Sequence, residues 1–402
     1  MTVVFLSVSA EMGGSEVSLL ELVRGLRRLA ADWPAHVIVP RDGGLAQAAA
    51  RVGATVHVLP LPDRLIRAGE TAVGAGAILG RSVSLLLAAG SAAPYGRRLG
   101  RLLADLSPDI VHTNGFKMHV LGARVAPRSS ALVWHLHEYV GRRPISRRVL
   151  RRYVGRCAAL VANSQSVAED IRAVLNPSVP VTTIYNAVDP REFSPEGPVA
   201  DLDGLAGMSP AADGTVRVGL LGTFGRWKGH ATFIEAMRLV NASSPCRGYI
   251  IGGALYDTGG SQYSREELAS QVASAGLTGR VGLTGFIERP ATALRALDIV
   301  VHASTQPEPF GLVIAEGLAV GRAVIVSMGG GAAELIRPDI DALTHEPGNA
   351  AVLARAIERL ADDAALRARL GAAGRRSALR RFDPDVFTRA FIDVYESTHV
   401  RH

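Results

Sequence analysis

Two carboxylates with seven residues between them, Glu308 and Glu316, lie in a segment that is otherwise apolar and should therefore be buried. Pro309 suits the first position of a helix and Gly311 has no side chain, so the segment predicts a helix N-terminus that offers bare N–H groups to an anion. In such a helix Glu316 lies about two turns from the start. Its carboxylate can then reach a ribose, while Glu308 stays at the mouth of the site.

A second candidate is the glycine-rich turn 222–229, which carries Arg226 and Lys228 just before a predicted helix. Backbone donors, the helix dipole and fixed cations act together on a diphosphate leaving group. Only Lys117 and Lys228 are lysines among the 44 basic residues, so a bias towards arginine has acted nearly everywhere else. A lysine retained against this bias indicates chemistry that needs it. Chance retention on a surface is the alternative, and Arg226 as a plain surface residue is the alternative at its position.

Paired glycines and a histidine mark two strand exits in the first half of the chain. Gly13 and Gly14 stand between the first predicted strand and a helix. There the backbone can approach a ligand closely, and the helix start favours an anion. Strand alternation places His135 and His137 on one face, with His137 at the carboxyl end where ligands bind. We interpret His137 as a site residue and His135 as a structural histidine.

Two further strand exits carry weaker candidates. Asn114 and Lys117 lie where a strand of the first half ends and are candidates for contact with a ligand. Phe286 and Ile287 follow the strand that ends at Gly285, and a core position is the alternative for Phe286.

The elements that must position these residues are short apolar runs that alternate with amphipathic stretches. This alternation predicts βαβ units and parallel sheets. The strands expected in the first half are 2–8, 35–39, 55–59, 109–113, 131–136, 158–162 and 181–184. Those expected in the second half are 216–221, 247–251, 281–284, 299–302, 323–326 and 341–344. The part from 350 to about 394 is helical by period, with Asp383 and Pro384 typical of an N-cap and a helix start.

A chain of 402 residues is too long for one ordinary core and suits two domains. We predict an α/β protein of two Rossmann-like, doubly wound domains that face a cleft, because ligands of open parallel sheets bind at the carboxyl ends of the strands. The predicted parts are a first domain 1–188, a proline-rich linker 189–215, a second domain 216–382, and a C-terminal helix 383–402 that packs back toward the first domain.

The cysteines, the N-terminus and the most apolar stretch indicate the cellular compartment. Cys157 and Cys246 lie far apart without metal-type spacing, which favours a reducing compartment. The N-terminus lacks a basic region and is typical of a buried first strand, so we predict a cytoplasmic protein. The most apolar stretch, 72–94, is interrupted by Arg81, and a buried or membrane-touching helix is favoured over a span.

The net charge of +7 is compatible with anionic partners. A basic helix carries arginines at 142, 143, 147, 148, 151, 152 and 156. A solvated face is the usual explanation of such a run. The functional alternatives are peripheral contact of 142–156 with the inner face of the membrane, or a patch for an anionic acceptor. Nucleic acid is not expected, because no aromatic residues interleave.

No metal is predicted. The D-x-D spacing occurs at Asp201/Asp203, Asp339/Asp341 and Asp383/Asp385, which fall in the linker, a turn and a helix cap.

Several of these motifs resemble one family. The segment 308–317, EPFGLVIAEG, is similar to the E-x7-E signature of the retaining GT-B glycosyltransferases, in particular family 4. Residues 330–336, GGAAELI, resemble the G-G-x-x-E-[LI] turn of that family, and residues 184–193, IYNAVDPREF, resemble the N-G-V-D…F start of its interdomain linker. The resemblance covers nearly the whole chain. It implies that the first domain, 1–188, lies on the acceptor side and that the second, 216–382, binds a nucleotide sugar.

The turn 222–229 is similar to the family's G-R-x-x-x-x-K-G pattern, with Lys228 at the lysine position. Thr223 stands where the family has arginine, and we expect Arg226 to substitute from three residues later. Gly13 and Gly14 resemble the family's first-domain glycine loop. His137 with Glu138 is similar to a His-Asp/Glu pair that closes over the donor sugar.

The resemblance implies a glycosyltransferase that moves a sugar from a nucleotide-diphosphate sugar, UDP- or GDP-linked, to a hydroxyl of a glycan, lipid-linked or small-molecule acceptor. Retention of anomeric configuration and no metal or other cofactor are implied with it. The implied catalytic residues are His137, Glu308, Arg226 and Lys228. The implied donor-binding residues are Gly13, Gly14, Thr223, Phe286, Ile287, Phe310, Gly311, Leu312 and Glu316, with Asn114, Lys117 and Glu138 on the acceptor side.

Two other functions fit the same residues. A nucleotide-sugar epimerase on this scaffold would also hold a sugar nucleotide. A non-catalytic nucleotide-sugar binder is the second alternative.

Overall fold

A computed structural model describes residues 1–62, 65, 93–254 and 260–399. The helix predicted at 72–94 lies outside these residues except for its last two positions. The chain divides into two compact units. Unit 1 comprises Met1–Ala187 and Pro384–His402, and unit 2 comprises Val188–Asp383.

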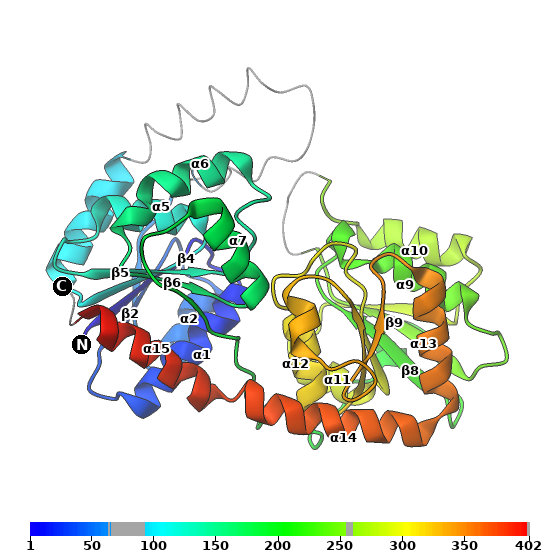
Figure 1. Cartoon of the computed structure of the whole chain (residues 1–402). Helices are drawn as coiled ribbons and strands as arrows, with labels where there is room; N and C mark the ends of the chain where they lie inside the picture. Colours follow the sequence, from blue (N-terminus) through cyan, green and yellow to red (C-terminus); the bar gives the residue numbers. More distant parts are fainter. Residues whose placement is uncertain (63–64, 66–92, 255–259, 400–402) are drawn as a thin grey trace. The chain divides into compact units, whose positions relative to one another are not determined.

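Unit 1 is built on a seven-stranded parallel sheet in the order β3-β2-β1-β4-β5-β6-β7 (Figure 1). Apolar, largely β-branched runs form its strands, because such side chains pack well on a pleated surface. The strands are β1 (Val3–Leu6), β2 (Ala35–Val39), β3 (Thr55–Val58), β4 (Ile110–Asn114), β5 (Ala131–Leu136), β6 (Ala159–Ala162) and β7 (Val181–Thr183).

Helices cover both faces of this sheet. One face packs against α1 (Gly14–Leu29), α2 (Gly44–Arg51) and α15 (Pro384–His399). The other packs against the helical residues 93–106 and against α5 (Phe116–Val125), α6 (Pro144–Tyr153) and α7 (Gln165–Leu175). A single 3₁₀ turn, η1 (Val154–Arg156), follows α6. No helix among the described residues is both long enough and apolar enough to cross a membrane.

Unit 2 repeats the design with a six-stranded parallel sheet in the order β10-β9-β8-β11-β12-β13. Its strands are β8 (Val216–Leu221), β9 (Cys246–Ile251), β10 (Val281–Gly285), β11 (Ile299–His302), β12 (Ala323–Ser327) and β13 (Leu343–His345). Both sheets therefore confirm the predicted α/β class with two doubly wound Rossmann-like sheets.

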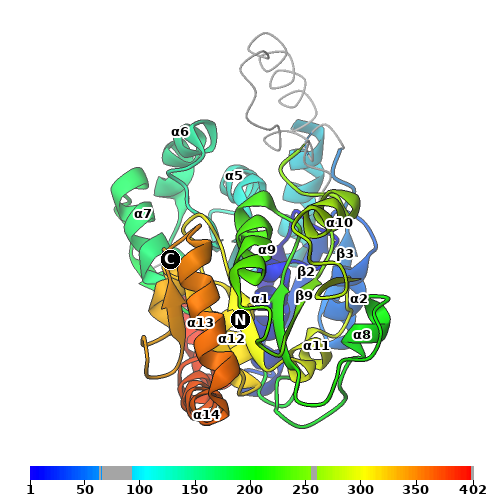
Figure 2. The same cartoon turned by 90° about the vertical axis from the view of Figure 1, so that its right-hand side faces the viewer.

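The helices of unit 2 also form two layers. Figure 2 faces the layer of α9 (His230–Leu239), α10 (Arg265–Ser274) and α13 (Ala350–Asp362). The remaining helices are α8 (Leu202–Leu205), α11 (Pro290–Ala296), α12 (Leu312–Ala319) and α14 (Ala364–Arg381), with 3₁₀ turns η2 (Arg226–Lys228) and η3 (Gly331–Leu335). Gly317 of α12 lies so close to β11 that an added Cβ would stand 3.3 Å from Val300.

Residues 189–215, for which a linker was predicted, belong to unit 2. The buried guanidinium of Arg295 donates to the backbone carbonyls of Glu192, Ser194 and Pro198. Further along, Asp203 accepts hydrogen bonds from Arg247 at 2.6 Å and from the Tyr249 hydroxyl at 2.7 Å. Charged groups therefore hold this segment to unit 2, together with the buried side chains of Phe193 and Leu202.

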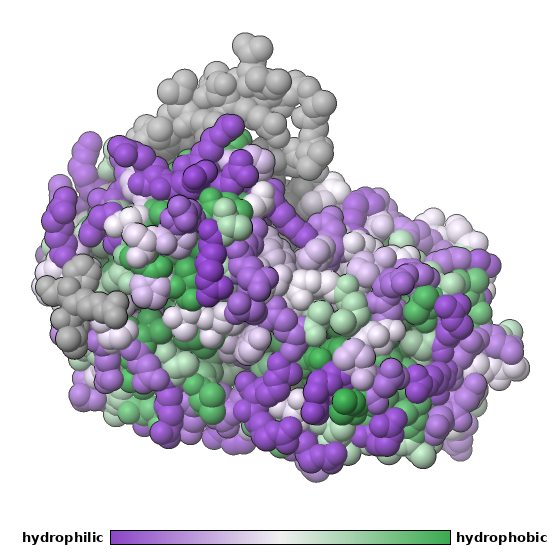
Figure 3. All heavy atoms as spheres, in the orientation of Figure 1, coloured by the Kyte–Doolittle hydropathy of each residue, from purple (hydrophilic) through white to green (hydrophobic). Residues whose placement is uncertain are grey.

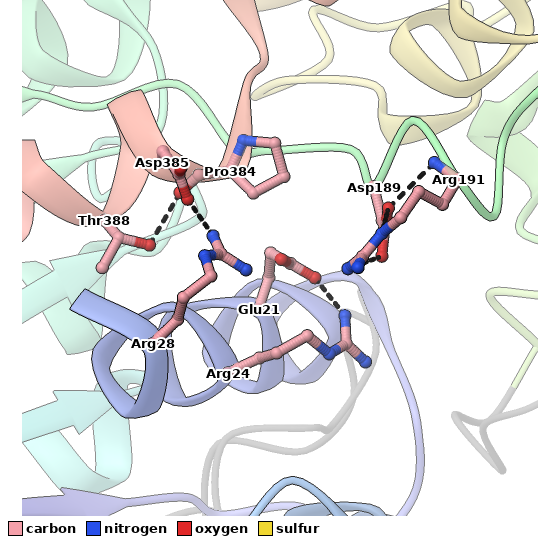
Figure 4. Close-up of polar contacts among 8 residues, drawn as sticks. All are labelled: Glu21, Arg24, Arg28, Asp189, Arg191, Pro384, Asp385 and Thr388. Carbon is pink, nitrogen blue, oxygen red and sulfur yellow. Dashed lines mark hydrogen bonds and ion pairs between the residues drawn. The ribbon is translucent and has the colours of Figure 1, made fainter. Parts of the chain in front are cut away.

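The C-terminal helix α15 packs on α1 within unit 1. Figure 4 shows Arg28 of α1 pointing to Asp385 at the start of α15, where the two side chains form an ion pair. The Tyr395 hydroxyl lies 2.6 Å from Nδ1 of His112 in β4. Where the helices cross, Gly25 faces Thr388, and a Cβ added at Gly25 would stand 2.8 Å from the Thr388 Cβ. The crossing therefore requires glycine.

Substituting Gly25→Ala should lower the free energy of unfolding by about 1–3 kcal/mol, because the added methyl overpacks the helix crossing. The measurement is urea unfolding followed by tryptophan fluorescence. Gly96→Ala is the matched control, since its Cβ would meet only Val125 at an ordinary 3.5 Å. There the better helix propensity of alanine should raise stability by up to about 1 kcal/mol. A shift of the same sign in both variants would contradict the packing argument.

Candidate active site

The strands β8 and β11 are neighbours in the sheet. The chain continues from β8 to β9 on one side and from β11 to β12 on the other, so the loops that follow β8 and β11 run in opposite directions. Such a switch point is where open α/β sheets bind ligands. The two loops are joined: the Thr305 N–H donates to the Trp227 carbonyl at 2.7 Å. Gly229 has φ +81°, and a Cβ there would stand 1.9 Å from the Ala303 carbonyl oxygen. The sequence therefore needs glycine at 229 to bring the 222–229 turn against the 303–311 loop.

This contact brings Lys228 to Glu308. The Lys228 ammonium donates to both carboxylate oxygens, at 3.1 and 2.9 Å. The Ser304 hydroxyl donates to Oε2 at 2.8 Å, and Nε2 of His302 lies 3.4 Å from the same oxygen. Glu308 is 6% exposed and Lys228 is half-buried, so the structure places a buried carboxylate beside a partly exposed cation.

The charge state of Glu308 follows from these neighbours. Burial by itself raises the pKa of a carboxyl, but here the Lys228 charge and the contact with His302 outweigh it and lower the Glu308 pKa to about 2. Glu308 is therefore an anion at neutral pH. It can accept hydrogen bonds from ligand hydroxyls, while Lys228 remains a cation beside it.

The prediction that Pro309 occupies the first helical position is wrong. Helix α12 begins at Leu312, and Gly311 is its N-cap with φ +93°, in the left-handed region. The Glu308 N–H donates to the Gly329 carbonyl at 3.2 Å, and Glu308 forms a parallel bridge with Gly330. This pairing keeps the backbone extended before the helix, so Glu316 lies only about one turn inside α12.

The other residues of this segment are packed rather than open. Phe310 is buried, with its ring edge-on to Phe382 at a centroid distance of 5.9 Å. Burial and the nearby charge of Glu192 raise the pKa of Glu316 to about 7. Glu316 is consequently divided between acid and carboxylate near neutral pH.

The base-side candidates follow β10. Phe286 is 63% exposed, so the alternative of a core position for it is wrong. Ile287 is half-buried beside it. An exposed aromatic ring after a strand at the carboxyl edge of the sheet is available for stacking.

In unit 1 the corresponding switch point lies between β1 and β4. Gly13 is the N-cap of α1 and Gly14 its first residue. The buried carboxylate of Glu16, whose pKa is raised by burial, accepts hydrogen bonds from Ser15 and from the backbone of Gly13. The amino end of this helix thus already holds a carboxyl group of its own chain.

A cluster of histidines occupies the ends of β4 and β5. His112 and His135 are buried and His137 is half-buried. The ring centroids of His135 and His137 lie 3.9 Å apart, and Nε2 of His112 lies 3.3 Å from the side-chain oxygen Oδ1 of Asn114. Burial lowers the pKa of His137 to about 3, and it lowers the pKa of His112 to about 3 with a contribution from the charge of His137. These rings are therefore neutral at neutral pH. Lys117, the second residue of α5, is half-buried close to the same strand end.

Comparison with known proteins agrees with this geometry. The model of Glycosyltransferase Family 4 matches residues 12–192, and the model of Glycosyl transferases group 1 matches residues 209–377. The lipopolysaccharide core biosynthesis glycosyltransferase LpsE of Rhizobium meliloti (strain 1021) is 30% identical over 278 residues, which are 68% of this chain and 74% of LpsE. The chain belongs to glycosyltransferase family 4.

Two further comparisons extend this result. The lipopolysaccharide core biosynthesis glycosyltransferase LpsD of the same organism is 34% identical over 202 residues, 50% of this chain and 54% of LpsD, so the match spans about half of that relative. The crystal structure of Anabaena HepE in complex with UDP-glucose is 24% identical, with a TM-score of 0.81 over 99% of this chain and all of HepE. The two sheets thus form the GT-B fold.

One departure from the family-4 pattern has a structural counterpart. Thr223, at the family's arginine position, is half-exposed in the turn after β8. Arg226 is not brought to the Lys228–Glu308 pair: its guanidinium donates to the Gly260 carbonyl at 2.9 Å and to Glu267 at 2.8 Å. These contacts hold the Arg226 guanidinium on the side of the turn that faces Gly260 and Glu267.

Sequence reasoning missed Ser304 and His302, which hold Glu308. The available signal was their place, since both are polar residues at the carboxyl end of an apolar strand. It also did not single out His119, which is buried and stacks on Trp134 at 5.1 Å. Glu138 is exposed and pairs with Arg143 at 2.7 Å.

The D-x-D pairs occupy structural positions. Asp201 caps α8, Asp341 pairs with Arg337, and Asp385 pairs with Arg28. Across residues 1–62, 65, 93–254 and 260–399, no three His, Cys, Asp or Glu side chains are grouped so that they could hold a metal ion.

Lys228→Met should lower the free energy of unfolding at pH 7 by about 3 kcal/mol, because it leaves the Glu308 charge buried without its cation. The wild-type pair has a carboxyl pKa of about 2 in the folded chain and 4.5 as its ordinary value, so its contribution is complete above about pH 4.5 and is lost as the pH falls toward 2. The difference between the two proteins should therefore shrink with acidification. Urea unfolding of both proteins at a series of pH values from about 3 to about 8 measures this difference in free energy.

The matched control is Lys228→Met combined with Glu308→Gln, which removes both charges. It should recover most of the lost stability at pH 7. A double variant as unstable as the single one would show that the loss comes from packing.

Proposed function

We propose that this family-4 chain transfers a sugar from a nucleotide-diphosphate sugar to an acceptor hydroxyl, with retention of anomeric configuration and without a metal. The observation that carries the proposal is the ion pair of half-buried Lys228 with buried Glu308 at the switch point of unit 2. It sets a fixed cation beside a fixed hydrogen-bond acceptor, and these are the two groups that a sugar with a departing diphosphate needs.

The leaving group is where negative charge develops. Lys228 would stabilise the distal phosphate together with the backbone N–H groups of the 222–229 turn and of residues 310–312. Because the lysine charge is balanced by Glu308 in the free protein, an incoming diphosphate has to compete for it. Glu308 then accepts hydrogen bonds from donor-sugar hydroxyls, and charge separates only as the diphosphate leaves.

The nucleotide is recognised by groups at the same edge of the sheet. Glu316 would bind the ribose hydroxyls, and Phe286 with Ile287 would lie against the base. A UDP- or GDP-sugar fits these contacts, and UDP is favoured because the similar HepE structure holds UDP-glucose.

On the acceptor side we assign Asn114, Lys117 and Glu138, with His137 contacting the donor sugar. A neutral His137 can donate one hydrogen bond to a hydroxyl and accept another. The proposal assigns no side chain as a covalent nucleophile. We therefore infer that the acceptor hydroxyl replaces the diphosphate on the same face of the sugar. A glycan or lipid-linked acceptor is supported by the names of LpsE and LpsD, which act in lipopolysaccharide core biosynthesis.

The first experiment identifies the donor by thermal shift with a panel of UDP- and GDP-sugars, and then follows the product by proton NMR. The expected product keeps the anomeric coupling of the donor, and turnover persists in EDTA. Lys228→Ala should lower kcat/KM by about 10²–10³, the usual loss when one group that stabilises transition-state charge is removed. Arg376→Ala, an exposed arginine of α14, is the control and should turn over normally.

Three outcomes would contradict the proposal. Inverted coupling would exclude retention, release of an epimerised sugar nucleotide without acceptor would establish the epimerase, and undiminished donor binding by Lys228→Ala would favour a binder in which this site has no role.

The ribose role of Glu316 predicts a pH-dependent KM for the donor. Because its pKa is raised to about 7, the carboxylate that accepts ribose hydroxyls is lost as the pH falls below 7. The donor KM should therefore rise by about tenfold between pH 8 and 6, because losing one hydrogen bond to a charged group weakens binding by about that factor. The kcat should change less. Steady-state kinetics across this range measure it. Glu316→Gln should have a high KM that does not vary with pH. A wild-type KM that is flat across the range would refute the assignment.

A further inference from the structure

The helix α6 presents an unusual surface. Between Glu138 and Glu169 the chain has seven arginines and no acidic residue. Only Leu150 of α6 is buried, whereas Ile145 is 52% exposed and Val149 is 38% exposed. These two apolar side chains stand one helical turn apart and so share one face of the helix.

Arginines surround this pair. Arg148 and Arg152 are exposed, and by helical spacing they lie on the same side as Ile145 and Val149. Figure 3 shows a mainly hydrophilic surface over α6, with small hydrophobic areas within it. In Figures 1 and 2 the helix lies at the outer edge of unit 1.

The arginines at the ends of this segment have partners inside the protein. Arg143 pairs with Glu138, Arg142 lies over the Tyr139 ring at 4.8 Å, and Arg156 donates to the Ala126 carbonyl. The four central arginines differ: within the described part of the chain no side-chain hydrogen bond or ion pair is formed by Arg147, Arg148, Arg151 or Arg152.

Keeping the four central arginines together has an energetic cost. Arg147 and Arg151, like Arg148 and Arg152, are four residues apart, and like charges at this spacing repel each other. A bias towards arginine explains why these residues are not lysine, but it does not explain why they gather without a carboxylate. α14 also carries an exposed pair at this spacing, Arg376 and Arg380, but its other arginines donate to backbone carbonyls of unit 2. An external anionic surface would remove the repulsion on α6.

We propose that α6 docks unit 1 onto the surface of an anionic lipid bilayer. The central arginines bind lipid phosphates, and Ile145 with Val149 enters the boundary between headgroups and acyl chains. The apolar pair favours a bilayer over nucleic acid, because aliphatic side chains gain nothing on a phosphate backbone. Tyr153, the aromatic residue one turn beyond Val149, is half-buried against the core of unit 1. Docking does not depend on the proposed function. Only its use, to bring the acceptor-side unit to a lipid-linked acceptor, rests on it.

The experiment is co-sedimentation of the full chain with sucrose-loaded vesicles, without donor or acceptor. Vesicles of phosphatidylglycerol and phosphatidylcholine should bind the wild type, and pure phosphatidylcholine should not. Arg148→Glu with Arg152→Glu should weaken binding at least about 25-fold, about fivefold for each arginine brought to the surface. Ile145→Ser with Val149→Ser should weaken it by about tenfold or more at unchanged salt dependence.

The matched control is Arg376→Glu with Arg380→Glu on α14, where two exposed arginines have the same spacing and the net charge changes equally. This control should bind as the wild type does, and circular dichroism checks that every variant is folded. Equal loss in the control would overturn the proposal, since net charge alone would then explain binding. Binding that survives either α6 variant would also overturn it.

A parallel measurement with single-stranded RNA distinguishes the rival partner. RNA binding that requires Arg148 and Arg152, together with no binding to anionic vesicles, would assign α6 to nucleic acid instead. Turnover of a water-soluble acceptor by the α6 variants is read separately, so a failure of docking and a failure of the transferase proposal give different results.

Discussion

The ion pair of Lys228 with the buried Glu308 is the constraint on which the arrangement of unit 2 depends. A carboxylate that is 6% exposed is costly unless a cation and hydrogen-bond donors reach it. Those groups come from two loops that are 80 residues apart in the chain. They meet only because β8 and β11 are neighbours at the centre of the sheet and because Gly229 leaves room for the Ala303 carbonyl. The Lys228–Glu308 ion pair therefore depends both on the strand order and on glycine at position 229.

The strands could be predicted from sequence because each is a short run of β-branched and other apolar residues bounded by turn residues. The expected ranges 131–136, 216–221 and 299–302 coincide with β5, β8 and β11. The start of α12 could not be predicted in the same way. Pro309 is a good first helical residue by local rules, but the pairing of Glu308 with Gly329 and Gly330 holds this part extended. That pairing joins distant parts of the chain and leaves no local signal.

For the candidate site, the sequence likewise predicted individual residues but not their contacts. Lys228 could be found because lysine is rare in this chain, and Glu308 because its segment is apolar. Their direct contact, and the alternative partner of Arg226, could not be found. Glu267, which pairs with Arg226, is 41 residues away and is a helix-capping residue by its local pattern. A single sequence shows which groups are unusual, whereas their partners depend on how the strands are ordered.

The two kinds of cation in this chain have different physical uses. Arginine offers five donors in a planar fork, and Arg295, Arg375 and Arg381 use it to hold backbone carbonyls that would otherwise lack partners. Lysine is a compact point charge that can move between acceptors, and Lys228 binds both oxygens of Glu308 through one ammonium group. A cation that must shift from a carboxylate to an incoming phosphate is better served by lysine. Under the proposed mechanism, lysine at position 228 therefore provides a charge that can change partners.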